Sequence, residues 1–318
     1  MNDKILNLLR SSRDYVSGEE ISHRLGISRQ AFWKHIQDLR DMGYEIEAVP
    51  HLGYRLIAIP DRLFPSEIER GLNTKFVGRK VYYFDNVSST MDIAMQLAAK
   101  GAAQGTIVLA ESQSKGRGRL NRGWISPKYK GIYLSLILRP DILPNDAPIL
   151  TLLAAVSACE AIKDSCGIDC YIKWPNDILV NNKKLGGILT ELNAEMDEIH
   201  YAIVGIGLNI NTDKKNLLSG AVSLKELKGE SVNRLQVLQS MLRHIESNYL
   251  LFQKKGGGAI IDKWRRFSDT LHRHVRIVSH KEQIEGQAVD IDKDGGLLVR
   301  EQSGFTRKVM AGDVWHCR

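Results

Sequence analysis

The spacing of apolar residues at the start of the chain is helical. Residues 2–9 predict a short helix with one apolar side. Ser17, with Glu20 three positions later, has the pattern of a capping box and predicts the start of a second helix, which Gly26 ends. Ser28 predicts the start of a longer helix that ends at Gly43. Its expected buried face consists of Ala31, Phe32 or His35, Ile36, Leu39 and Met42.

Residues 44–59 change to the alternating pattern of strands, with a turn at residues 50–53. Helices at about 18–42 followed by two strands predict a winged helix-turn-helix, a fold that binds DNA. The candidate DNA contacts lie at the start of the longer helix and are Ser28, Arg29, Gln30, Trp33 and Lys34. A solvent-exposed helix face and a protein-docking module are the alternatives that this pattern leaves open.

The middle of the chain mixes the two spacings. Helices are predicted at residues 91–100 and 147–164, and strands at residues 80–85, 106–110, 131–138, 170–174, 178–180, 185–192 and 202–208. Asn181 and Asn182 join two of these strands in a hairpin. Because hairpins stand beside helices, we predict an α+β domain with a mixed sheet rather than a doubly wound fold.

The last part of the chain begins with amphipathic helices at 232–253 and 260–267. It then changes to short strands at 275–279, 284–291, 296–301 and 305–310, with turns at Lys281 and at 294–295. Such a run predicts a small β-barrel of the SH3-like type. The predicted domains are residues 1–62, 63–269 and 270–318.

Composition adds limits on class and location. The chain has 318 residues, of which 43% are hydrophobic and 25% are charged, as in ordinary globular proteins. Its N-terminus carries charges and no stretch is long and apolar enough for a membrane span, so we expect a cytoplasmic protein without membrane contact. The cysteines lack paired spacing and are expected to be free thiols: Cys159, Cys166, Cys170 and Cys317.

The net charge of +7 permits an anionic partner, either a nucleic acid or a nucleotide. Residues 1–62 hold equal numbers of basic and acidic residues, so the excess lies in the later domains. DNA binding is therefore argued from the placement of the helix residues and not from charge.

The strongest local signal is the stretch 116–124, which reads GRGRLNRGW. Glycine lets the backbone approach a ligand closely, and arginine matches carboxylate and phosphate oxygens two at a time. The stretch predicts an anion-binding loop, with a solvated basic turn as the alternative. The full GxGxxG pattern and the Walker A pattern are both absent, so a nucleotide would bind in another way.

Four further stretches carry candidate chemistry. Ser88, Ser89 and Thr90 offer a cluster of hydroxyls or a helix cap. KWPND at 173–177 places a cation and a carboxylate where a strand ends, and a hairpin would return Lys184 towards them. GIGLNIN at 205–211 is a buried strand with two amides at its exit.

In these motifs, their order and their approximate spacing, the sequence resembles biotin protein ligases of the bifunctional repressor type, the BirA family, over essentially its whole length. The resemblance implies an enzyme that joins the biotin carboxylate to the α-phosphate of ATP and then passes biotin to a lysine of a biotin carboxyl carrier protein. It also implies a biotin-responsive repressor of biotin biosynthesis and transport genes that binds operator DNA as a ligand-promoted homodimer.

The resemblance also implies roles for single residues. Arg119 and Lys184 are the catalytic candidates. The biotin-binding candidates are Ser89, Thr90, Gln113, Arg117, Gly118, Arg119 and Lys184. The candidates for ATP and the adenylate are Arg117, Arg119, Arg122, Lys173 and Asn209. Mg²⁺ is expected on the phosphates, with Asp177 and Asn209 as helpers and no firm protein ligand.

Three positions depart from the common wording of the family. Met91 stands where a polar residue often follows the Ser and Thr pair, and Leu120 and Asn121 stand where some members carry basic or glycine residues. The segment 212–224 occupies the place of the loop that covers adenine in the family. Two other functions stay open: a ligand-sensing repressor without ligase activity, and a lipoate or octanoate protein ligase.

Overall fold

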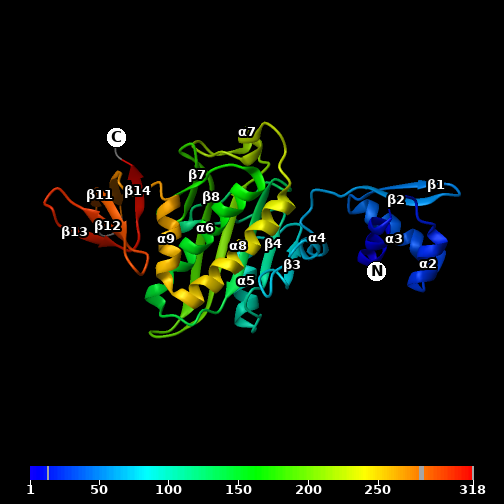
Figure 1. The fold of residues 1–318 in the computed structure, drawn as a ribbon, viewed down its shortest axis with the longest axis horizontal. Helices are drawn as coiled ribbons and strands as arrows, with labels where there is room; N and C mark the ends of the chain where they lie inside the picture. The colour runs from blue at the N-terminus through cyan, green and yellow to red at the C-terminus, as the bar shows by residue number, and fades with distance from the viewer. Residues whose placement is uncertain (13, 279–282, 317–318) are drawn as a thin grey trace. The chain divides into compact units, whose positions relative to one another are not determined.

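The computed structural model describes residues 1–12, 14–278 and 283–316. The chain forms two compact units, Met1–Arg62 and Leu63–Arg318. Figure 1 shows the helices and strands of each unit, and each unit is described by itself below.

The first unit has the predicted helix-turn-helix followed by a hairpin. Its elements are α1 (Asn2–Ser11), α2 (Gly18–Leu25), α3 (Arg29–Asp41), β1 (Glu45–Val49) and β2 (Gly53–Ala58). The Ser28 hydroxyl accepts a hydrogen bond from the Ala31 amide at 3.1 Å and caps α3. Ser17 caps α2 but accepts from the Glu19 amide, one residue earlier than a capping box would have it.

The wing is fixed to the helices by close packing. The rings of Phe32 and Tyr54 lie 5.0 Å apart, edge to face. Gly53 has φ +118°, and a Cβ there would lie 2.2 Å from the Val16 carbonyl oxygen, so the position requires glycine. On α3 the prediction was right for Phe32, Ile36 and Leu39, which are buried. Ala31, His35 and Met42 are only partly covered.

The second unit is built on the predicted mixed sheet. Its seven strands, in spatial order, are β3 (Val81–Phe84), β4 (Ile107–Ala110), β5 (Gly131–Leu138), β9 (Ile199–Asn209), β8 (Lys183–Ala194), β7 (Asp177–Val180) and β6 (Tyr171–Lys173). Only β3 and β4 are parallel. Asn181 and Asn182 have φ of +51° and +60°, as a tight hairpin between β7 and β8 requires.

Helices cover the two faces of this sheet differently. One face packs against three helices, α6 (Pro148–Cys166), α8 (Arg234–Lys255) and α9 (Gly257–Phe267), which lie in front of the sheet in Figure 1. Among the described helices, α5 (Thr90–Ala99) packs against the other face. Two short helices, α4 (Pro65–Arg70) and α7 (Leu224–Lys228), were not predicted. A cavity lies on this face between α5, the loop at 113–124 and β9.

A buried ion pair joins the sheet of this unit to α8. The guanidinium of Arg234, at the start of α8, lies 2.7 Å from the Glu111 carboxylate, and both side chains are 0% exposed. Glu111 follows β4, and its other oxygen accepts a hydrogen bond from the Leu63 amide at 2.8 Å. Arg234 also donates to the Gly131 carbonyl at 3.0 Å. The pair therefore fixes the exit of β4 to β5, to α8 and to the first residue of the unit.

The end of the chain is a five-stranded antiparallel sheet. Its strands are β10 (His274–Val278), β11 (Gln283–Ile291), β12 (Leu297–Arg300), β13 (Thr306–Val309) and β14 (Asp313–His316), in the order β13-β12-β11-β10-β14. The arrangement agrees with the predicted SH3-like domain and adds β14, which the sequence pattern did not indicate. The predicted turn at Lys281 lies outside the described residues.

Two predictions from composition can be compared with the described residues. Cys159, Cys166 and Cys170 are free thiols, and burial raises the pKa of Cys159 well above its ordinary value. Cys317 lies outside the described residues. No helix in the described part of the chain is long and apolar enough to cross a membrane.

We predict that replacing Arg234 destabilises the second unit strongly. The variant Arg234→Met leaves the Glu111 carboxylate buried without its cation, which costs about 3–5 kcal/mol. Arg265→Met is the matched control, because Arg265 pairs with Asp290 at the surface and such pairs contribute about 1 kcal/mol or less. Denaturant unfolding measures both, and equal losses in the two variants would contradict this account.

Candidate active site

The basic loop closes a cavity on the face of the sheet that carries α5. Strand β9 forms the floor of the cavity, and its residues Gly205 and Gly207 line it. A Cβ at Gly207 would lie 2.6 Å from the Trp124 ring, and a Cβ at Gly205 would lie 2.6 Å from Met91 Sδ. The two glycines therefore let the loop and α5 approach the strand, and any side chain there would fill the cavity. Met91 packs on this floor as an apolar residue.

One end of the cavity is a network of neutral polar groups. The Gln113 side-chain oxygen accepts hydrogen bonds from the Thr90 amide at 2.9 Å and from the Thr90 hydroxyl at 3.1 Å. The Gln113 amide donates to the Ser126 hydroxyl at 3.0 Å, and Ser135 donates to Thr90 at 2.8 Å. These bonds fix the orientation of the Gln113 side chain, which lines the cavity.

Ser89 lines the same end. Ser89 is 1% exposed, and its hydroxyl has no hydrogen-bond partner among the described residues. Ser89 precedes α5, but its side chain does not cap the helix. A buried hydroxyl without a partner costs free energy, so this group is ready for a polar ligand atom.

The basic loop places its three arginines in different surroundings. Arg117 pairs with Asp92 of α5 at 2.7 Å and with Glu191 of β8 at 3.2 Å. Arg122 pairs with Asp313 of β14. The loop between them turns through Leu120 and Asn121, at φ of +54° and +56°, and closes by a 2.7 Å hydrogen bond from the Gly118 amide to the Arg122 carbonyl.

Arg119 differs from the other two. It donates to the Asn176 side-chain oxygen at 3.1 Å and to the Gly312 carbonyl at 3.4 Å, both neutral acceptors. Burial lowers its pKa, and the nearby carboxylates Asp313 and Asp177 oppose that shift. The guanidinium of Arg119 is thus partly buried and has no direct carboxylate partner among the described residues.

Lys184 stands across the cavity. Its ammonium lies 2.6 Å from the Asp177 carboxylate and 5.6 Å from the centre of the Trp124 ring. The backbone of Lys184 is hydrogen-bonded to the segment 212–224. Its amide donates to the Gly220 carbonyl at 2.8 Å, and its carbonyl accepts from the Val222 amide at 2.9 Å. The segment that the resemblance assigns to adenine is therefore attached directly to Lys184.

The cavity brings together most of the residues selected from the sequence: Ser89, Thr90, Gln113, Arg117, Gly118, Arg119, Arg122, Asp177 and Lys184. Two candidates do not line it. The Lys173 ammonium lies over the Trp315 ring, 5.9 Å from its centre, and burial lowers the pKa of Lys173. The Asn209 side chain donates a hydrogen bond to the Val222 carbonyl at 3.3 Å and so helps to hold the segment 212–224 in place.

The structure adds residues that the sequence reasoning missed. Asn176 stands within the KWPND stretch, and its position beside Asp177 could have indicated it. Gly312 and Asp313 gave no sequence signal, because their strand was not predicted. Asp92 and Glu191 were also missed, since only the fold brings them to Arg117.

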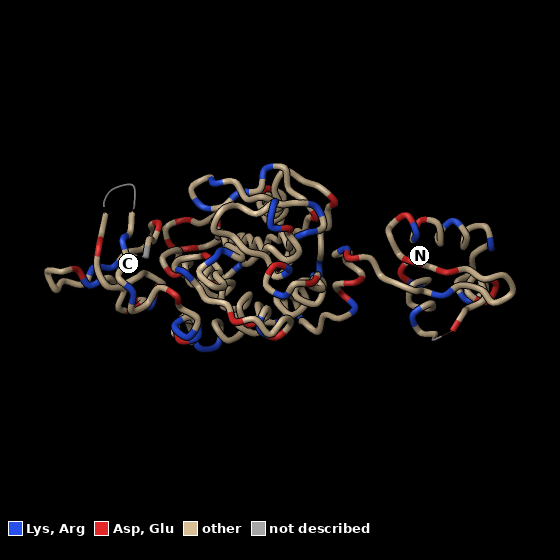
Figure 2. Tube along the Cα trace, turned by 90° about the horizontal axis from the view of Figure 1, so that it is seen from above, with Lys and Arg blue, Asp and Glu red and all other residues tan. Residues whose placement is uncertain are grey.

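The candidate DNA contacts lie on the surface of the first unit. Gln30 and Lys34 are exposed, and Trp33 has 57% of its surface exposed. Arg29 is exposed but pairs with Glu19 of α2. Figure 2 shows basic and acidic positions interspersed along this unit, which agrees with its balanced charge.

Comparisons with known proteins show the family to which this chain belongs. Family models match an HTH domain at residues 2–55, the biotin/lipoate A/B protein ligase family at 83–209, and the biotin protein ligase C-terminal domain at 270–316. The chain is 42% identical over 309 residues to the bifunctional ligase/repressor BirA of Bacillus spizizenii, covering 96% of this chain and 95% of that protein. The chain belongs to this family.

Other members of the family support the assignment. The bifunctional ligase/repressor BirA of Escherichia coli is 30% identical, with 98% of this chain and 95% of that protein covered. Among solved structures, the biotin protein ligase from Aquifex aeolicus in complex with biotin and ATP matches with a TM-score of 0.66 and 29% identity, over 76% of this chain and 99% of that chain. The predictions of family, of fold and of a ligase joined to a repressor are thus confirmed.

Proposed function

We propose that the cavity activates biotin with ATP and that the chain then transfers biotin to a lysine of a biotin carboxyl carrier protein. The observation that carries this proposal is that two cations, Arg119 and Lys184, line the same cavity. The hydrogen-bond acceptors of Arg119 are neutral groups. Two anions must meet in the first step. Fixed cations in a partly dry site lower the cost of bringing them together.

The first step joins the two substrates. A carboxylate oxygen of biotin attacks the α-phosphorus of ATP, the bond between the α-phosphorus and the bridging oxygen breaks, and pyrophosphate leaves. Arg119 and Lys184 neutralise the charge that gathers at this junction. Ser89, Thr90 and Gln113 supply the hydrogen bonds that the ureido ring of biotin needs when it is buried.

In the second step the amine of the acceptor lysine attacks the acyl carbon and AMP leaves, so that an amide forms. The segment 212–224, which is attached to Lys184, covers the adenylate and keeps water from the reactive anhydride. Mg²⁺ would be held mainly by the substrate phosphates, as this ion usually is at nucleotide sites. Asp177 and Asp313 are the carboxylates that line the cavity.

The other parts of the proposal concern the whole chain. We divide it into a DNA-binding domain at 1–62, a ligase domain at 63–269 and a C-terminal domain at 270–318. It acts in the cytoplasm, which the free thiols of Cys159, Cys166 and Cys170 support. The biotinyl adenylate favours a homodimer that binds a palindromic operator.

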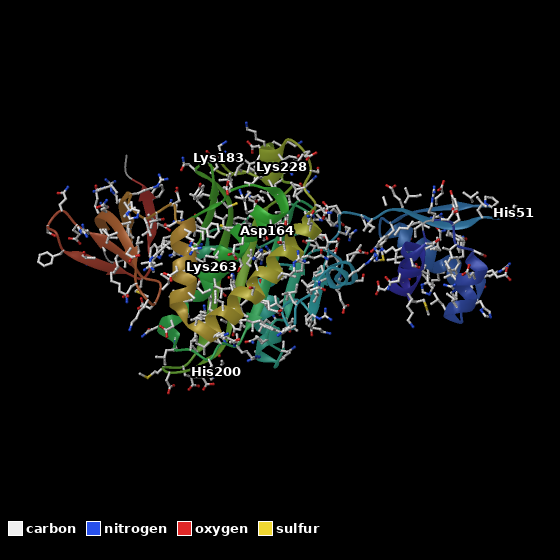
Figure 3. All side chains as sticks on the ribbon, viewed as in Figure 1. His51, Asp164, Lys183, His200, Lys228 and Lys263 are labelled. Atoms are coloured by element: carbon white, nitrogen blue, oxygen red, sulfur yellow. The ribbon has the colours of Figure 1, made fainter. Side chains whose placement is uncertain are left out.

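The ligase proposal predicts that Lys184→Gln lowers the initial rate of biotin transfer to a carrier domain by about 10²–10³-fold, because one fixed charge is lost at the junction. Lys183→Gln is the matched control. Lys183 is the neighbouring residue on β8, is exposed and is labelled in Figure 3, and its replacement leaves the rate unchanged. If the folded Lys184→Gln protein were as fast as the Lys183→Gln protein, Lys184 would have no such role.

The repressor proposal predicts that biotin and ATP together tighten operator binding at equal protein concentration. The probe is DNA selected by the protein from a random library, and its sequence is expected to be palindromic. Lys34→Gln weakens binding and lowers the salt slope by about 1, while Lys4→Gln, on α1, leaves both unchanged. Binding that does not respond to biotin and ATP would contradict the coupling.

A further inference from the structure

The C-terminal sheet enters the cavity through one short segment at the start of β14. The Gly312 carbonyl accepts a hydrogen bond from Arg119, and the Asp313 carboxylate lines the cavity and pairs with Arg122. The segment is held in place by β10, because Asp313 pairs with Val278 in the ladder. A Cβ on Gly312 would lie 2.5 Å from the Ile277 side chain. The carboxylate therefore has a position fixed by the sheet.

The charges around the cavity are nearly balanced within the chain. Its basic residues are Arg117, Arg119, Arg122 and Lys184. Arg117 and Lys184 pair with carboxylates of the ligase domain. Arg122 differs, since its carboxylate comes from the C-terminal sheet. Its side chain is 64% exposed, whereas that of Asp313 is 23% exposed, so the arginine can leave the pair more easily than the aspartate.

We propose that Asp313 is an internal counterion, which holds Arg122 when no substrate is bound and is replaced there by a phosphate of ATP. This inference rests on the proposed function of the cavity. In the substrate-free chain the carboxylate reduces repulsion between Arg122 and Arg119, and it opposes the lowering of the Arg119 pKa by burial. Arg122 contacts Asp313 through Nη2 and Oδ2, whereas a phosphate carries more negative charge and can engage the guanidinium fork with two oxygens, so it displaces the carboxylate. Asp313 is thus a positioning residue that weakens nucleotide binding.

The exchange has a consequence for the C-terminal sheet. When Arg122 turns to phosphate, the sheet loses its ion pair with the basic loop and keeps the Gly312 bond to Arg119. When pyrophosphate leaves, Arg122 returns to Asp313. The contact between the two parts of the second unit therefore changes with the state of the nucleotide.

The test measures the affinity of α,β-methylene-ATP, which does not form the adenylate, in the presence of biotin. Asp313→Asn is expected to bind about two- to fivefold more tightly than the unchanged protein, the range that an exposed pair supports. The difference disappears at about 1 M salt. Asp290→Asn makes the same charge change in the same sheet, at a residue that pairs with Arg265 and does not line the cavity, and leaves the affinity unchanged.

A double-mutant cycle separates this exchange from a general effect on structure. Arg122→Gln weakens nucleotide binding, and adding Asp313→Asn to it brings no further gain. The inference is overturned if Asp313→Asn weakens binding, if it has no effect, or if its gain persists without Arg122. Should Asp313→Asn fail to fold, unchanged affinity in Arg122→Gln alone overturns it. If the unchanged, folded protein binds no nucleotide with biotin present, the proposed function itself fails.

Discussion

The buried pair of Glu111 and Arg234 is the contact on which the position of the active site depends. It fixes the end of β4, from which the basic loop starts, to β5 and to the first turn of α8. Separating the two groups would leave an uncompensated buried charge, so this contact is costly to break. The loop that follows, from Gln113 to Trp124, is thereby positioned so that the Trp124 ring packs on Gly207 of β9.

Within that frame, the cavity has a neutral polar end and a charged end. Ser89, Thr90 and Gln113 form the neutral end, where a hydroxyl without a partner and an oriented amide suit a buried ring with polar atoms. Arg119, Arg122 and Lys184 form the charged end. All but Arg119 carry a carboxylate partner there. The charged end suits the carboxylate and the phosphate that the ligase reaction brings together.

Much of this was predictable from the sequence, for reasons that differ by region. Ser28 and the turn at Asn181 and Asn182 act through local backbone geometry, so their patterns predicted the helix and the hairpin. The motifs at 116–124 and 173–177 predicted the cavity through resemblance. Asp92, Glu191 and Asp313 could not be predicted, because long-range packing alone brings them to the arginines. For the same reason Lys173 and Asn209 lie outside the cavity although their motifs border it.

The most direct test of the central claim is exchange of labelled pyrophosphate into ATP by the purified protein, with Mg²⁺ and with biotin, lipoate or octanoate supplied in turn. This reaction reports formation of the acyl adenylate without the acceptor protein. The account predicts exchange with biotin and none above background with the other two acids. Exchange with lipoate or octanoate instead would contradict the assignment of the neutral end of the cavity to biotin, and the absence of exchange with all three would contradict the ligase itself.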